Sequence, residues 1–101
     1  MISTSEKIYR LVAKIPKGKV TTYGTIAKKL KISPRIVGFV LHVNKNPEKI
    51  PCHRVVDRNG NVAKNYAFGG NLKQKEKLEK EGVTFKKKMQ VNLGLHFYEL
   101  N

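Results

Sequence analysis

Apolar and polar positions near the start of the chain follow the period of an amphipathic helix. Ile8, Leu11 and Val12 fall at positions i, i+3 and i+4, so residues 5–14 are predicted to form a helix with one buried face. The run Ile15-Pro16-Lys17-Gly18 ends this pattern, because proline and glycine interrupt regular structure.

The next apolar stripes predict two short helices joined by a tight turn. Thr21-Thr22 can cap a helix over about residues 23–31. Ser33-Pro34 combines an N-cap with a proline at the first helical position, which predicts a new helix over about 34–43. This arrangement is typical of a helix-turn-helix, here over about residues 23–43, although many small helical domains share the pattern.

The second half of the chain predicts less regular structure. Val55-Val56 begins a short extended segment, and Asn59-Gly60 is a favourable pair for a hairpin turn that leads towards Val62. The charged residues 72–81 predict a helix that ends at Gly82, since glycine is preferred just after a helix.

Apolar positions alternate again between Met89 and Phe97. This period of two predicts a strand that adds to a small sheet, with a final helical turn near Phe97 as the alternative. The chain has no internal repeat and no linker, so residues 1–101 are predicted to form one domain. Its predicted fold class is mainly α with a small β element, of the winged helix-turn-helix type.

The charge of the chain narrows the class of partner. Lysine and arginine number 21 against 7 acidic residues, which gives a formal net charge of +14. An excess of this size repels itself in a compact fold, so it favours a polyanionic partner, most simply nucleic acid. The alternative is a basic surface that serves solubility alone.

Cysteine content and hydropathy bear on the cellular compartment. A single cysteine excludes an intramolecular disulfide, and the His and Cys groupings are too few for a structural zinc site. No apolar run approaches membrane-spanning length, and the first residues lack the apolar core of a signal peptide. We therefore expect no membrane partner and a reducing compartment, the cytoplasm of a prokaryote or the nucleus of a eukaryote.

Candidate chemistry is concentrated in the segment Ile50-Pro51-Cys52-His53-Arg54-Val55-Val56. A lone cysteine is more often a small buried apolar residue than a nucleophile. A histidine and a cation beside it can raise the thiolate fraction, however, and thiolate is the reactive form. Neighbours on a strand point to opposite faces, so adjacency of Cys52 and His53 in sequence does not establish contact.

The run Pro51-Cys52-His53-Arg54-Val55 resembles the active-site signature of the O6-alkylguanine-DNA alkyltransferases, the methylated-DNA–protein-cysteine methyltransferases. The resemblance covers roughly residues 5–85. The other matching segments are Val20 to Ala27 for the first helix of the helix-turn-helix, Pro34 to Gly38 for the recognition helix, Asn44, Tyr66, Gly69-Gly70 and Glu81-Gly82.

This resemblance implies a catalytic group. Cys52 would accept the alkyl group, His53 would take the thiol proton through a water, and Glu81 would orient His53. Asn44 and Tyr23 would complete the group. From the residues alone, Glu81 is better explained by a salt bridge to Lys77 at i, i+4.

The resemblance also implies contacts with the minor groove of double-stranded DNA. A base inside a duplex cannot reach a thiol, so it must be extruded. Arg35 would fill the vacated stack, and Tyr23 would push on the target phosphate and assist the leaving guanine. Ser33 and Gly38 would lie against the DNA. The plainer alternatives are a phosphate contact for Arg35 and a half-buried aromatic role for Tyr23.

The implied guanine pocket is formed by Pro47, Val55, Tyr66, Phe68 and Gly69, with Asn44 also bracing the turn before the active-site segment. Arg54 would anchor that segment. His42 and His96 match no functional position, so a surface or packing role is expected for both.

Several features depart from the pattern. The loop between Cys52 and Tyr66 is one residue longer than usual, and Ile36 and Phe39 are bulkier than the residues often found on the recognition helix. The N-terminal domain of full-length members is expected to be absent from residues 1–101.

Two functions therefore remain open. The first is a single-turnover repair protein that transfers an alkyl group to Cys52 without metal or organic cofactor, acting as a monomer. The second is a non-enzymatic binding protein like the alkyltransferase-like proteins, which have this size and bind the lesion to signal for excision repair. In those proteins the cysteine is replaced, whereas this chain has Cys52.

Overall fold

The computed structural model describes residues 2–100. The helices are α1 (Thr4–Ala13), α2 (Tyr23–Leu30), α3 (Pro34–His42), α4 (Gly70–Lys80) and α5 (Leu93–His96), with a 3₁₀ turn, η1, at Cys52–Arg54. The strands are short: β1 (Thr21–Thr22), β2 (Val55–Val56), β3 (Phe85–Lys87) and β4 (Gln90–Val91). The predicted mainly α fold with a small β element is confirmed.

Local side-chain caps determine where α2 and α3 begin. The hydroxyl of Thr22 accepts a hydrogen bond from the backbone N–H of Thr25 at 3.1 Å, and that of Ser33 accepts one from Arg35, also at 3.1 Å. Lys31 ends α2 in the left-handed region at φ 59°, which turns the chain sharply into α3. Both predicted helices are therefore present within one residue of their expected ends.

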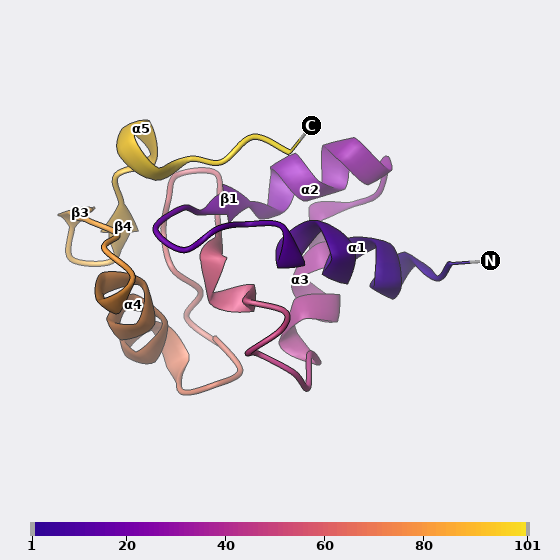
Figure 1. The fold of residues 1–101 in the computed structure, drawn as a ribbon, viewed down its shortest axis with the longest axis horizontal. Coiled ribbons are helices and arrows are strands. Elements are labelled where there is room, and N and C mark those ends of the chain that lie inside the picture. Colours follow the sequence, from indigo (N-terminus) through magenta and orange to yellow (C-terminus); the bar gives the residue numbers. More distant parts are fainter. Residues whose placement is uncertain (1, 101) are drawn as a thin grey trace.

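The first hydrophobic core lies between α1, α2 and α3, which Figure 1 shows grouped at one end of the molecule. Its fully buried members include Ile8 and Val12 of α1, Ile26 of α2 and Val37 of α3. Cys52 belongs to the same cluster. Cys52 therefore packs against the buried side of the helix-turn-helix.

The second core lies under α4 and the two small sheets. Buried members are Val20, Val56, Val62, Leu78, Val83 and Val91. Strands β1 and β2 pair in parallel, with Thr21 opposite Val55 and Thr22 opposite Val56. This pairing fastens the start of α2 to the chain directly after Cys52.

The chain turns at Asn59-Gly60 as predicted, but the segment after the turn pairs with a different part of the chain from the one expected in a hairpin. Gly60 N–H donates to the Asp57 carbonyl at 2.9 Å, which closes the turn. The returning chain does not pair with β2. Instead, Val62 N–H donates to Met89 at 3.0 Å and Val91 N–H donates to Gly60 at 2.9 Å. The partner strand comes from the C-terminal part of the chain, because β2 is already paired with β1.

The strand predicted over residues 89–97 is mostly wrong. Only Gln90–Val91 is a strand, and it pairs antiparallel with β3. Asn92 then starts the short helix α5, where its carbonyl accepts from Leu95 N–H at 3.1 Å and His96 N–H at 3.2 Å. The alternative of a helical turn near Phe97 describes this end better. Among the described residues, no helix is long and apolar enough to cross a membrane.

Candidate active site

Two side chains on either side of residues 50–56, which we call the active-site loop, hold this loop in place. After α3, Asn44 donates to the Ile50 carbonyl at 2.9 Å and accepts from Asn46 N–H at 2.9 Å. On the other side, the fully buried Gln74 of α4 donates to the carbonyls of His53 and Val55, both at 3.0 Å. These bonds fix the 3₁₀ turn that carries Cys52.

The role of Gln74 was not foreseen in the sequence. Besides its two donated bonds, its carbonyl oxygen accepts from Ala63 N–H at 2.8 Å, so one side chain joins the active-site loop to the following loop. The available signal was its position four residues before the buried Leu78, on the inner face of an otherwise charged helix.

Cys52 lines a small hollow at the junction of the helix-turn-helix and the loop before α4. The hollow has a volume of about 140 Å³. Its other walls include Tyr23 from α2, Gly38 and His42 from α3, and Tyr66 from the loop. An engineered apolar cavity of about 150 Å³ holds one benzene ring, so the hollow can receive part of a flat aromatic group. His42, for which a surface or packing role was expected, is exposed and forms part of the wall of this hollow.

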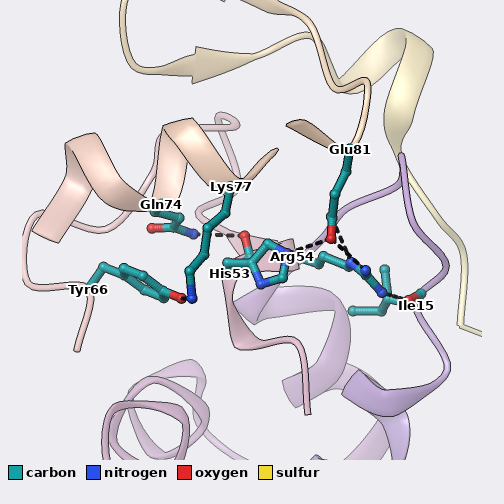
Figure 2. Close-up of polar contacts among 7 residues, drawn as sticks. All are labelled: Ile15, His53, Arg54, Tyr66, Gln74, Lys77 and Glu81. Atoms are coloured by element: carbon teal, nitrogen blue, oxygen red, sulfur yellow. Dashed lines mark hydrogen bonds and ion pairs between the residues drawn. The ribbon is translucent and has the colours of Figure 1, made fainter. Parts of the chain in front are cut away.

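The side chains of His53, Arg54 and Glu81 lie together at one side of the site, as Figure 2 shows. Glu81 receives two bonds from Arg54, Nε to Oε1 at 2.9 Å and Nη2 to Oε2 at 2.6 Å. Its Oε2 lies 3.0 Å from His53 Nε2, a close polar contact between the carboxylate and the imidazole. Arg54 also donates to the Ile15 carbonyl at 2.8 Å, which anchors the loop to the end of α1.

The surroundings determine which of these groups carry charge. Burial lowers the pKa of His53, although the Glu81 carboxylate partly opposes this, so the imidazole is neutral near pH 7. Burial opposes ionisation of Glu81, but bonding to Arg54 and His53 outweighs it and lowers the pKa of the carboxyl. Glu81 is therefore paired with Arg54 and His53, and not with Lys77 as the plainer alternative required.

Cys52 and His53 line different hollows. Cys52 faces the hollow beside Tyr23, whereas His53 lines a more open one with Pro47, Lys77 and Glu81. Burial raises the pKa of the Cys52 thiol, while hydrogen bonding by Asn44, the charge of Lys77 and hydrogen bonding by Tyr66 oppose the rise. The resting thiol is protonated, so it needs a base to react quickly at neutral pH.

The residues expected in the guanine pocket occupy different places. Tyr66 lines the hollow of Cys52, whereas Pro47 lines the hollow of His53. Val55 is fully buried, and Phe68 packs edge-on against Tyr66 with ring centroids 5.7 Å apart. Gly69 precedes α4 at φ 119°, where an added Cβ would lie 2.3 Å from the Lys73 side chain.

Of the expected DNA-contacting residues, three lie along α3 or cap it, and Tyr23 begins α2. Ser33 caps the helix and Arg35 is exposed in its first turn. Gly38 has open space where a Cβ would be and reaches the hollow of Cys52. Tyr23 is half-buried, and burial raises the pKa of its hydroxyl to about 12, so the hydroxyl stays protonated and can donate.

Lys77 is a further residue at the site that sequence reasoning did not place there. Its Nζ donates to the Tyr66 hydroxyl at 3.0 Å and lies 5.4 Å from the centroids of both the Tyr66 and Phe68 rings. By contrast, His96 has the packing role expected of it, since its ring contacts Thr84 and the Gly18 carbonyl.

Comparison with known proteins identifies the family. Residues 3–83 match the family described as 6-O-methylguanine DNA methyltransferase, DNA binding domain. The protein therefore belongs to this family, and its fold is that of the family's DNA-binding domain.

Individual relatives fall into two groups. A methylated-DNA–protein-cysteine methyltransferase of Methanocaldococcus jannaschii is 47% identical over 77 residues, which cover 76% of this chain and 44% of the relative. Alkyltransferase-like protein 1 of Schizosaccharomyces pombe is 37% identical over 97 residues, covering 94% of this chain and 85% of the relative. The chain spans a quarter to about half of the curated methyltransferases it matches.

Solved structures show the same relationship. The crystal structure of S. pombe Atl1 in complex with damaged DNA containing O6-carboxymethylguanine superposes with a TM-score of 0.84 at 31% identity. The match covers 98% of this chain and 99% of that one. The match to the alkyltransferase-like protein covers more of both chains, whereas the methyltransferase of M. jannaschii has the higher identity over the part that matches.

Proposed function

We propose that this protein repairs O6-alkylguanine in double-stranded DNA by transferring the alkyl group to its own Cys52, once per molecule. The observation that carries the proposal is the position of Cys52 in a hollow walled by Tyr23 and Gly38 of the helix-turn-helix. A base delivered by α2 and α3 would reach the thiol directly. The family membership and the name of the M. jannaschii relative support the same activity.

Binding to DNA would use the exposed side of α3. Arg35 and Gly38 lie on α3, and Ser33 caps its start, so the helix can approach the minor groove closely where Gly38 has no side chain. The net charge of +14 would supply affinity for the phosphates. Arg35 would enter the stack in place of the extruded nucleotide.

The transfer would proceed as a displacement. The Cys52 sulfur attacks the alkyl carbon, a sulfur–carbon bond forms, and the carbon–O6 bond breaks with its electron pair passing to the guanine. The thiol proton moves through solvent to the neutral His53, and the imidazolium that results is stabilised by Glu81 3.0 Å away. Tyr23 donates a hydrogen bond to the departing guanine anion, which takes up a proton from solvent while the imidazolium returns its proton to solvent, so His53 ends neutral.

The alkyl group would stay on the protein, because a thioether has no leaving group that water can displace readily. Each molecule would then react once. Removal of O6-methylguanine from an oligonucleotide should stop at one lesion per protein molecule. Continued turnover, or no removal at all, would overturn the proposal.

A second function is favoured by the match to the alkyltransferase-like protein, which covers 99% of the solved S. pombe chain. In that case the protein would bind the lesion without reacting. A comparison of Cys52→Ala with the wild type separates the two functions. If the protein transfers the alkyl group, the wild type removes it from the modified oligonucleotide, whereas the variant binds the oligonucleotide and leaves it unchanged. If the protein only binds the lesion, the variant and the wild type both bind the oligonucleotide and leave it unchanged.

A further inference from the structure

The direction of the Lys77 side chain is unusual for a lysine on a charged helix, because it forms neither a solvent-exposed surface position nor an ion pair with Glu81. Its side chain is half-buried, and it points from α4 to the Tyr66 hydroxyl rather than to solvent (Figure 2). The acidic group four residues further on, Glu81, is paired with Arg54 and His53 instead. Burying part of a lysine among aromatic rings is costly unless its charge is used.

Three residues on one face of α4 organise the site. Gln74, Lys77 and the C-cap Glu81 are spaced three or four positions apart, so they point the same way. Gln74 holds the backbone of the active-site loop and Glu81 holds His53. Lys77 holds the tyrosine that shares the hollow with the thiol.

The hydrogen bond from Lys77 determines what the Tyr66 hydroxyl can do. Because the ammonium group donates to the hydroxyl oxygen, the hydroxyl proton is free to be donated elsewhere. Cys52 lines the same hollow as Tyr66, and the pKa of Tyr66 is raised, mainly by burial, so the hydroxyl proton is retained. A donor polarised by a cation forms a stronger hydrogen bond to an anion.

We propose that Lys77 is a positioning residue for the reactive thiol, which holds the Tyr66 hydroxyl as a donor towards Cys52 and supplies a positive charge that favours the thiolate. The inference rests on the proposed function only in taking Cys52 as the nucleophile. The titratable groups that interact with this thiol come from several elements: Tyr9 of α1, Tyr23 of α2, Tyr66 of the loop and Lys77 of α4. Among these four, Lys77 alone carries a positive charge.

The test compares three variants by the rate at which iodoacetamide alkylates Cys52. In this reaction the thiolate displaces iodide from carbon and the thiol proton passes to solvent, so the rate follows the thiolate fraction. Lys77→Met removes the charge and the donor, and Lys77→Arg keeps both. Lys80→Met is the matched control, because it removes one charge from an exposed position of the same helix, where the Lys80 ammonium lies 3.5 Å from Glu76.

We expect Lys77→Met to react about five- to tenfold more slowly at neutral pH. The pH at which the alkylation rate increases should also be higher for this variant than for the wild type. Lys77→Arg and Lys80→Met should stay within about twofold of the wild type. Urea denaturation of each variant checks that the comparison is between folded proteins.

Equal rates and pH profiles for Lys77→Met and the wild type would overturn the inference. So would an equal loss in Lys77→Met and Lys77→Arg, which indicates packing alone, or an equal loss in Lys80→Met, which indicates a general charge effect. The same variants are then assayed on an O6-methylguanine oligonucleotide. If the wild type transfers no methyl group while the iodoacetamide order holds, the proposed function fails and the role of Lys77 stands.

Discussion

Glu81 is shared between His53 and Arg54, and this sharing determines the charges of the site at the scale of single residues. The carboxylate has two bonds from Arg54 and a 3.0 Å contact with His53. His53 is thereby oriented while burial keeps it neutral, which is the state in which it can accept a proton. Arg54 keeps Glu81 ionised and also ties the loop to Ile15.

The free energy of unfolding should fall as the pH is lowered from neutrality. The pKa of folded His53 is lowered, so below its ordinary value of 6.5 the unfolded chain binds the proton first and the folded state loses stability. The pKa of folded Glu81 is lowered too, so stability is lost further below 4.5, its ordinary value. Urea denaturation at a series of pH values measures both steps.

Two variants assign these steps. His53→Gln should remove the upper step, and Glu81→Gln should remove the lower one while reducing stability at neutral pH by about 3 kcal/mol, because Arg54 is left without its partner. A wild-type unfolding free energy that stays constant between neutrality and about pH 4 would contradict the assigned charges.

At the scale of elements, α4 supports the site and α3 is proposed to deliver the substrate. The carbonyls of His53 and Val55 have their hydrogen bonds from one buried side chain, Gln74. The α3 helix presents exposed Arg35 beside Phe39, a residue that is 68% exposed. The α4 helix bonds the active-site loop through Gln74, whereas α3 lines the hollow of Cys52, so changes in each should have separable effects.

Gln74→Leu should destabilise the fold strongly. Leucine fills a similar volume but leaves two carbonyls and the Ala63 N–H buried without this partner, at a cost of about 3 kcal/mol or more. Urea denaturation measures the loss. Glu79→Ala, an exposed position on the same helix, is the control and should change stability by less than about 0.5 kcal/mol. Equal stability of Gln74→Leu and the wild type would show that the loop does not depend on Gln74.

Arg35→Ala should impair repair of duplex DNA without impairing the chemistry. If Arg35 replaces the extruded base, its loss slows transfer from a duplex by about tenfold or more, because extrusion costs a few kcal/mol. Transfer from free O6-benzylguanine, which needs no extrusion, should be unchanged. Lys86→Ala in β3 controls for the lost charge. Equal losses on both substrates would reject the role of Arg35 in extrusion.

The elements differ in how well the sequence predicted them. The helices α1, α2 and α3 follow from apolar spacing and from the Thr22 and Ser33 caps, which act over a few residues. The pairing of Thr21-Thr22 with Val55-Val56 does not, because two-residue strands far apart in sequence have no detectable period. The prediction of a long C-terminal strand was wrong because the apolar residues around Leu93 are also compatible with a short helix.

The site shows a similar division. The spacing of Cys52, Asn44 and Glu81 carried the resemblance, whereas the contacts of Gln74 and Lys77 depend on how α4 packs against the loop. A glutamine or lysine in a charged helix is normally a solvated residue. Only the tertiary structure distinguishes Lys77, which bonds Tyr66, from Lys80, which remains 73% exposed.

At the scale of the whole molecule, a net charge of +14 on 101 residues should dominate affinity for DNA. Counterion release makes such binding strongly dependent on salt. If four phosphates are neutralised, affinity for duplex DNA should fall about 100-fold between about 50 and 200 mM salt. Fluorescence anisotropy with a labelled duplex measures this. A dissociation constant that does not change with salt would contradict binding through the phosphates.

The central claim is that Cys52 is the acceptor of the alkyl group, and the mass of its peptide tests this most directly. The protein is incubated with an excess of duplex containing O6-methylguanine, digested, and examined by mass spectrometry. We predict a gain of one CH₂ on the peptide that carries Cys52, on nearly every molecule and on no other peptide. An unmodified Cys52 peptide from protein that has bound the duplex tightly would contradict the account and establish a lesion-binding protein instead.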